Sequence, residues 1–143
     1  MCTPSLSSTL RALVVLAATT AVALALAASS SATSGSSSAN GYTVTASLSP
    51  DIVAPGQFVT ASGSVTNNTA SVATTTVTVA LTGPGISRSA SRTIIFAAGQ
   101  TRSLTRTLRV PLTAPAGTYT LTVIAQNATS GATTQASAST QVT

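Results

Sequence analysis

The chain has 143 residues, of which only 5% are charged, against about 25% in an average soluble protein. It contains no His, Glu, Lys or Trp, its one acidic residue is Asp51, and all six basic residues are arginines. This inventory excludes Ser-His-Asp triads and paired carboxylates, and it leaves zinc and calcium almost no side-chain ligands. We therefore expect no enzyme activity, no cofactor and no metal site. Asp51 lies in a Ser-Pro-Asp sequence, where a short acid commonly stabilises a turn.

The N-terminal segment is typical of a secretory signal peptide. Arg11 precedes an uncharged apolar run over 12–28, and small residues follow the A-x-A pattern near its end. We predict a signal peptide helix over 1–28, with cleavage near Ala28. The alternative is a membrane anchor, but a spanning helix needs about 20 apolar residues and this run is slightly short. Cys2, the only cysteine, lies within this leader.

Residues 29–40 are rich in Ser, Gly and Ala, which predicts a flexible linker. The pattern changes at residue 41, because "YTVTASLS" alternates apolar and polar residues from Tyr42 onward. Such alternation indicates a strand with one buried face. Phe58, which begins the next such segment, is out of phase with its neighbours and is expected near one end of the domain.

The same alternation continues to the C-terminus. Turn signals of Pro, Gly and Asn separate the further segments "FVTASGSVTNN", "VATTTVTVALTGPG", "ISRSASRTIIFAAGQ", "TRSLTRTLRVPL", "GTYTLTVIAQN" and "TTQASASTQV". About seven short strands with turns every 8–12 residues predict an all-β domain over 41–143, a single antiparallel immunoglobulin-like β-sandwich. An all-β barrel stays open, since period two alone does not separate the two folds.

The arginines show one conflict with this scheme. Leu104, Arg106 and Leu108 are spaced two residues apart, so all three would lie on one face of a regular strand. Arg106 would then point toward the core, where an unpaired charge is costly. Either a β-bulge resets the phase, or the strand lies at a sheet edge from which the arginine reaches solvent. We interpret the mature chain's arginines as a basic contact stripe, in which Arg102, Arg106 and Arg109 lie beside Arg88 and Arg92 on a neighbouring strand.

Three further residues are candidates for special roles. Tyr119 stands near the start of its strand, where immunoglobulin-like sandwiches form a tyrosine corner, so its hydroxyl is expected to reach the 112–116 segment. Asn67 and Asn127 each begin an N-x-T triplet at a predicted strand end, a pattern that glycosylation enzymes accept at exposed sites. The plainer interpretation of both is an asparagine that stabilises a turn.

From residue 42 to 142 the sequence resembles the bacterial immunoglobulin-like modules of the CARDB type, the cell-adhesion-related domain of bacteria. The likeness rests on "PGQFVTASGSVTNNT", "AAGQTRSLTRTLRVP" and "APAGTYTLTVIAQNAT", which look like that family's second strand, its long polar strand and its penultimate strand. The resemblance implies a non-catalytic module of secreted or surface proteins.

We therefore expect a secreted or cell-surface module that acts in adhesion, protein–protein contact or envelope structure. Its partner would be another protein or a cell-surface polymer; nucleic acid is not expected, and the membrane is met only during export. One alternative is a self-assembling subunit of a fibre or layer, because the last strand, 133–142, has neither charge nor proline to guard its edge. Another is a glycan-binding accessory domain that uses the arginine stripe.

Overall fold

A computed structural model describes residues 32–143 of the chain. The predicted signal peptide, 1–28, and the first residues of the predicted linker lie outside the described residues. The strands follow in the order β1 (Thr33–Ala39), β2 (Tyr42–Ser49), β3 (Ile52–Val53), β4 (Phe58–Asn67), β5 (Ala73–Gly83), β6 (Ile86–Phe96), β7 (Thr101–Arg109), β8 (Gly117–Asn127) and β9 (Thr133–Val142).

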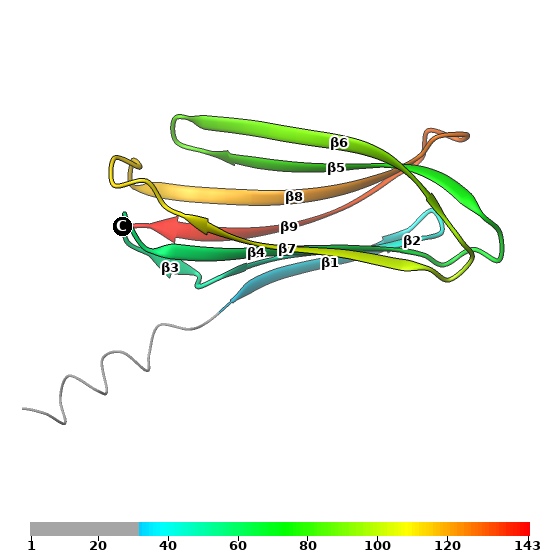
Figure 1. Cartoon of the computed structure of the whole chain (residues 1–143), viewed down its shortest axis with the longest axis horizontal. Helices are drawn as coiled ribbons and strands as arrows, with labels where there is room; N and C mark the ends of the chain where they lie inside the picture. Colours follow the sequence, from blue (N-terminus) through cyan, green and yellow to red (C-terminus); the bar gives the residue numbers. More distant parts are fainter. Residues whose placement is uncertain (1–31) are drawn as a thin grey trace, which may run out of the picture. The chain divides into compact units, whose positions relative to one another are not determined.

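The strands form two sheets that pack face to face (Figure 1). The four-stranded sheet has the order β1-β2-β4-β7, and the five-stranded sheet has the order β3-β9-β8-β5-β6. Pairing is antiparallel except between the short β3 and β9. The predicted immunoglobulin-like β-sandwich is confirmed, but the described chain holds nine strands where about seven were expected.

The core lies between the sheets and follows the predicted alternation. Tyr42, Val44, Ala46 and Leu48 of β2 are fully buried, while the residues between them are half-buried. The inward residues of β8 and β9 are buried in the same way; they are Leu121, Val123, Ala125, Ala136, Ala138 and Val142. Period-two patterning therefore identified the inner faces of these strands correctly.

The predicted flexible linker is wrong for residues 33–39, which form β1. This strand pairs along its whole length with β2, and Asn40 and Gly41 connect the two strands. Both turn residues have positive φ, 51° and 80°, as the tightest hairpin turns require. Asn-Gly is the strongest short hairpin signal in a sequence, and the Ser-rich composition around it hid that signal.

β1 also closes one side of the sandwich against β9. Oγ1 of Thr134 donates a hydrogen bond to the Ala39 carbonyl at 2.7 Å, and Nδ2 of Asn40 donates to the Thr133 carbonyl at 2.9 Å. At its other end, β9 pairs with β3 through Gln141 and Val142. The last strand, which the self-assembly alternative treats as a free edge, therefore contacts β1 and pairs with β3 at one end.

The sheets approach each other most closely where β1 and β2 face β8 and β9. On the opposite side, β7 and β6 are the outer strands of their two sheets, and every residue of β7 is exposed. The sandwich is therefore closed along one side and open along the other. Within residues 32–143 there is no helix long and apolar enough to cross a membrane.

Candidate functional site

Two of the three arginines of β7, Arg102 and Arg106, lie on the inner face of an edge strand. β7 pairs with β4 in one unbroken register, in which Arg102 stands opposite the buried Val65 and Arg106 opposite the buried Ala61. No bulge resets the phase, so of the two alternatives for Arg106 the edge strand is correct. Leu104 and Leu108 share that inner face, yet they remain 50% and 41% exposed because the other sheet does not cover them.

The arginines of β6 face the same space from the other sheet. In the register of β5 and β6, Arg88 stands opposite Leu81 and Arg92 opposite Val77, both of which pack toward the core side. Side chains that are opposite one another in an antiparallel pair project on the same face. Arg88 and Arg92 therefore project inward, across the opening from Arg102 and Arg106.

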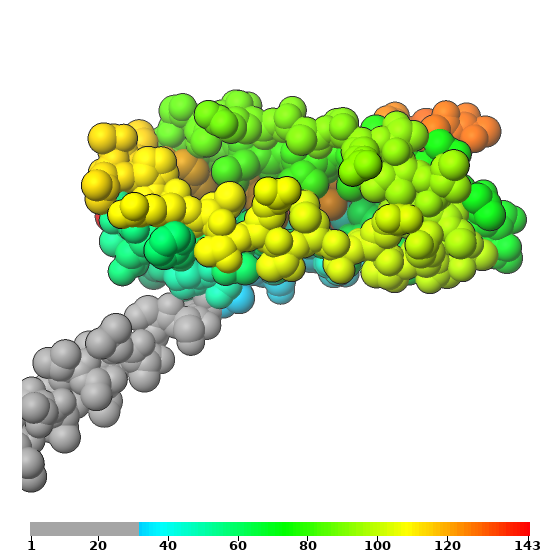
Figure 2. All heavy atoms as spheres, viewed as in Figure 1, coloured from blue at the N-terminus to red at the C-terminus, as the bar shows by residue number. Residues whose placement is uncertain are grey.

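A groove occupies the space between these two walls. It has a volume of about 890 Å³, and its floor is formed by aliphatic side chains of β5 and β8, among them Val79, Leu121 and Val123. In the space-filling view the surface is hollowed between the green atoms of β5 and β6 and the yellow atoms of β7 (Figure 2). The arginine-rimmed groove, as we call it, reaches from solvent to the core.

The charges that line this groove are all positive. Arg88, Arg92, Arg102 and Arg106 line it and are exposed, and no carboxylate of the described chain does so. Asp51, the only acid in the sequence, lies in the turn between β2 and β3, where its carbonyl accepts a hydrogen bond from the Gln141 amide. The groove therefore combines an apolar floor with a rim of uncompensated positive charge.

The predicted basic stripe needs two corrections. Arg88 and Arg92 are not on a strand next to β7 in one sheet; they stand on the opposite wall of the groove. Arg109 does not belong to the groove, because it pairs with Phe58, which is exposed on the outer face of β4. The Arg109 Nε donates a hydrogen bond to the Gly56 carbonyl at 3.2 Å.

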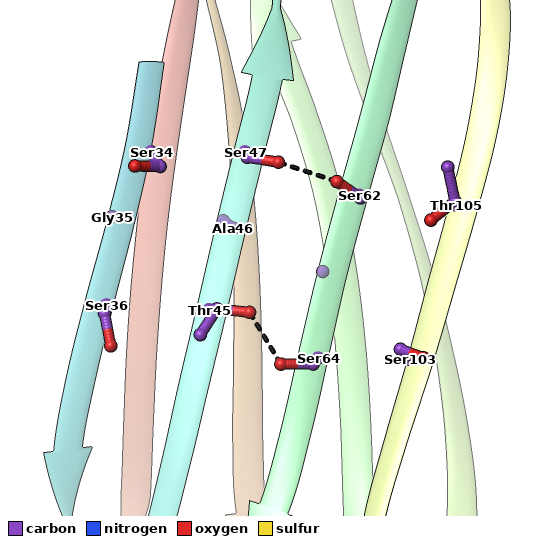
Figure 3. A pocket seen from close by; sticks show the side chains of 11 residues that line it. Ser34, Gly35, Ser36, Thr45, Ala46, Ser47, Ser62, Ser64, Ser103 and Thr105 are labelled. Carbon is purple, nitrogen blue, oxygen red and sulfur yellow. Dashed lines mark hydrogen bonds between the residues drawn. The ribbon is translucent and has the colours of Figure 1, made fainter. Parts of the chain in front are cut away.

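The outer face of the four-stranded sheet forms a second distinctive surface (Figure 3). The outward positions of its strands are Ser or Thr at 34, 36, 38, 43, 45, 47, 49, 60, 62, 64, 66, 101, 103, 105 and 107. Neighbouring hydroxyls bond to one another across strands, as in Thr45 with Ser64 and Ser47 with Ser62, each pair at 2.6 Å. We call this surface the hydroxyl face; a shallow depression of about 380 Å³ lies on it. Because the hydroxyls pair laterally and carry no charge, the hydroxyl face has no chemistry of its own beyond hydrogen bonding.

Tyr119 stands at the start of β8 and is half-buried. Its hydroxyl lies 3.0 Å from the Pro115 carbonyl, within the 112–116 segment, and 3.3 Å from the Pro84 carbonyl in the β5–β6 turn. Tyr119 therefore connects the loop before β8 to the hairpin that forms one end of the groove wall.

The expectation that Asn67 is accessible for glycosylation is wrong, because its side chain is fully buried. Its Nδ2 donates to the carbonyls of Ser71 and Ala97, and its Oδ1 accepts from the amide and hydroxyl of Thr69. Asn127 is half-buried, its Oδ1 caps a turn, and its Nδ2 donates to the Tyr42 hydroxyl at 3.3 Å. Both asparagines stabilise turns, as the plainer interpretation of the sequence holds.

Within residues 32–143 there is no group of three or more His, Cys, Asp or Glu residues that could hold a metal ion. These surfaces can bind a partner molecule. The hydroxyl face offers hydrogen bonds, and the arginine-rimmed groove offers apolar and cationic contacts.

The fold and these surfaces define an immunoglobulin-like β-sandwich with one open side. No protein-family model and no curated protein matches the sequence. Among solved structures, the chain is similar to the CARDB domain of a Pyrococcus furiosus protein, solved in complex with di-metal ions. The match has a TM-score of 0.52 at 14% identity and covers 81% of this chain and 90% of that chain. The fold is therefore that of a CARDB domain.

Two larger proteins match over a small part of their length, with TM-scores below 0.5. An alkylpurine DNA glycosylase from Pseudomonas fluorescens, solved with DNA, matches over 67% of this chain with a TM-score of 0.49 and 14% identity. A β-glucosidase from Listeria innocua matches over 79% of this chain with a TM-score of 0.43 and 16% identity. The matches span only 28% and 16% of those two chains.

Proposed function

We propose that the chain is a non-catalytic, immunoglobulin-like contact module, exported to the cell surface or beyond, which binds another protein through its arginine-rimmed groove. The observation that carries the proposal is the exposure of Leu104 and Leu108 on the inner face of β7, at 50% and 41%. A sandwich that worked only as a spacer would gain free energy by closing over these side chains, since each Å² of apolar surface removed from water contributes about 25 cal/mol.

The non-catalytic part of the proposal rests on the inventory of side chains. General acid–base catalysis needs a positioned His, carboxylate, Lys, Tyr or Cys. In the described chain Tyr42 is buried, the Tyr119 hydroxyl is engaged in a structural hydrogen bond, and Asp51, in the turn between β2 and β3, does not line the groove. Export is supported by the signal-peptide pattern of the first residues, which is independent of the groove.

Cell fractionation tests export, and site-specific cross-linking tests contact. In the producing cells the chain should be found outside the cytoplasm, with a mass that corresponds to cleavage near Ala28. A photo-reactive residue at position 104, in the groove, should cross-link to a protein, whereas the same residue at position 64, on the hydroxyl face, should not.

Matched charge variants make this experiment specific. The groove variant Arg92→Glu/Arg106→Glu should lose the cross-link, and Arg109→Glu, which changes a charge outside the groove, should keep it. A cytoplasmic chain of full length, or a cross-link at position 104 that survives in the groove variant, would overturn the proposal. If a polysaccharide were cross-linked instead, the glycan-binding alternative would replace it.

A further inference from the structure

The geometry of the groove points to one kind of partner, and this inference rests on the proposed function. We propose that the arginine-rimmed groove receives an extended strand from another protein, which adds to the free edge of β7 and presents acidic residues at every fourth position, with an apolar residue midway between them.

The first support is the backbone of β7. This strand pairs with β4 on one side only, and it is the outer strand of its sheet. Neither β7 nor β6 contains proline, and β7 runs for 9 residues in one unbroken register. A sheet edge of this kind offers a row of free N–H and C=O groups, to which an extended peptide can add as a further strand. A strand added there would lie in the mouth of the groove, between β7 and β6.

The second support is the spacing of charge along both walls. On β7, Arg102 and Arg106 are separated by Leu104 on the same face; on β6, Arg88 and Arg92 are separated by Ala90. At about 3.3 Å per residue, the two arginines of each wall lie roughly 13 Å apart along the strand. Since an added strand shares this period, its acids should recur every fourth residue, with an apolar side chain between them to meet the floor.

Charge complementarity excludes a second copy of this chain as the occupant. The sequence contains one acid, Asp51, and that residue lies in the turn before β3. The β7 arginines of a second copy would lie against the arginines of the groove, and these like charges would repel one another. Inward-pointing charges are a common way in which edge strands prevent pairing with like copies. Here the same charges would repel a second copy and attract an acidic strand. Repulsion and attraction would both contribute to the specificity of the groove.

The arrangement also favours a peptide over a lipid or a glycan. A fatty acid carries its charge at one end, whereas the arginines are distributed along both walls. Sugars are commonly bound on aromatic rings, but Phe96, the aromatic residue that lines the groove, is fully buried, and the rest of the apolar floor is aliphatic. Aliphatic side chains of a strand match such a floor, because they remove its apolar surface from water.

The test uses a synthetic peptide with the repeating pattern Glu-Thr-Val-Thr, so that Glu and Val share one face. Its fluorescence anisotropy is measured against the mature chain at low and at physiological salt. We expect saturable binding that weakens as salt rises, since charge pairs at exposed sites are screened. Hydrogen–deuterium exchange should show new protection at those β7 amides that do not pair with β4.

Matched probes separate charge from backbone pairing. A peptide with Lys in place of Glu should not bind. A peptide with Pro in place of the central Thr should also fail, because it removes a ladder hydrogen bond. Sodium myristate and an alginate oligosaccharide are the lipid and glycan probes. If either bound in an arginine-dependent way while the Glu peptide did not, the strand proposal would be overturned.

Charge reversal supplies the decisive control. Arg92→Glu/Arg106→Glu should bind the Glu peptide at least about tenfold more weakly, the effect of losing one charge-assisted hydrogen bond, and should bind the Lys peptide instead. That rescue also shows that the variant is folded. Arg109→Glu should bind the Glu peptide as the parent chain does. If no peptide bound while the cross-link from position 104 persisted and depended on the arginines, the strand proposal would fail and the contact function would stand; if both were lost, both would fail.

Discussion

The hydroxyl of Tyr42 in β2 lies 2.7 Å from Oγ1 of Thr75 in β5, and this buried hydrogen bond joins the two sheets of the sandwich. Asn127 extends the contact, since its Nδ2 donates to the same tyrosine oxygen at 3.3 Å. No buried side-chain nitrogen or oxygen atom of the described chain lacks a partner. The three side chains thus fix the separation of the sheets at one end of the sandwich, while the side between β6 and β7 stays open.

Replacing Tyr42 with Phe should lower the free energy of unfolding by about 1–3 kcal/mol. The ring still fills its place, but Thr75 Oγ1 and Asn127 Nδ2 lose a partner, and unsatisfied buried groups cost about that much. Urea denaturation of the mature chain measures the change. The double variant Tyr42→Phe/Thr75→Val should be less destabilised than the two single changes together predict. An unchanged midpoint for Tyr42→Phe would contradict the role of this hydrogen bond.

Replacing Tyr119 with Phe should be milder, at about 0.5–1.5 kcal/mol, the usual net contribution of one hydrogen bond. The hydroxyl of Tyr119 bonds to Pro115 at an exposed position, where water replaces the lost partner. Thermal denaturation followed by circular dichroism compares Tyr119→Phe with Tyr42→Phe. We expect Tyr42→Phe to be the more damaging of the two, and the opposite order would show that the corner at Tyr119 stabilises the fold more than the contact between the sheets.

Gly35→Ala should destabilise the domain by about 1–3 kcal/mol, the usual effect of overpacking. A Cβ at Gly35 would overlap the backbone carbonyl oxygen of Ser137, so β1 would have to move away from β9. Ser36→Ala, which changes an exposed residue next to it in the same strand, is the control and should have little effect. Equal stabilities of the two variants in urea would mean that β1 does not pack on β9 as closely as described.

Two leucines on inner faces should respond differently to truncation. Leu121→Ala removes a side chain that is 5% exposed and should cost about 2–5 kcal/mol, the usual range for a buried leucine. Leu104→Ala removes one that is 50% exposed and should cost less than about 1 kcal/mol. Guanidinium denaturation of both variants tests the open groove. If Leu104→Ala were as damaging as Leu121→Ala, the groove would be closed in solution.

Period-two patterning predicted most of the fold, because burial of one strand face imposes that period on the sequence. It placed the inward residues of β2, β8 and β9 correctly. It missed β1, whose small residues acquire strand structure from pairing with β2 rather than from their own propensity. The Asn40-Gly41 pair was the local signal that could have revealed this hairpin.

The groove itself could not be predicted from the sequence. Parity indicates that Arg106 shares a face with Leu104, but it does not say how far the opposite sheet stands from that face. The separation depends on which strands lie at the edges, and strand order is a long-range property. Only in the structure do Arg88 and Arg92 come to face Arg102 and Arg106 across one opening.

The hydroxyl face has a consequence for how this molecule meets others in solution. Apart from Asp51 and Arg109, which lies at one end of the outer face of the four-stranded sheet, the formally charged side chains of the described chain are gathered in the arginine-rimmed groove, and the Ser and Thr positions of the hydroxyl face carry none. Such a distribution concentrates the electric field in a single direction, and fields of this kind orient charged partners before contact. An approaching polyanion would be oriented toward the opening between β6 and β7. The uncharged Ser and Thr surface would exert no comparable long-range attraction on it.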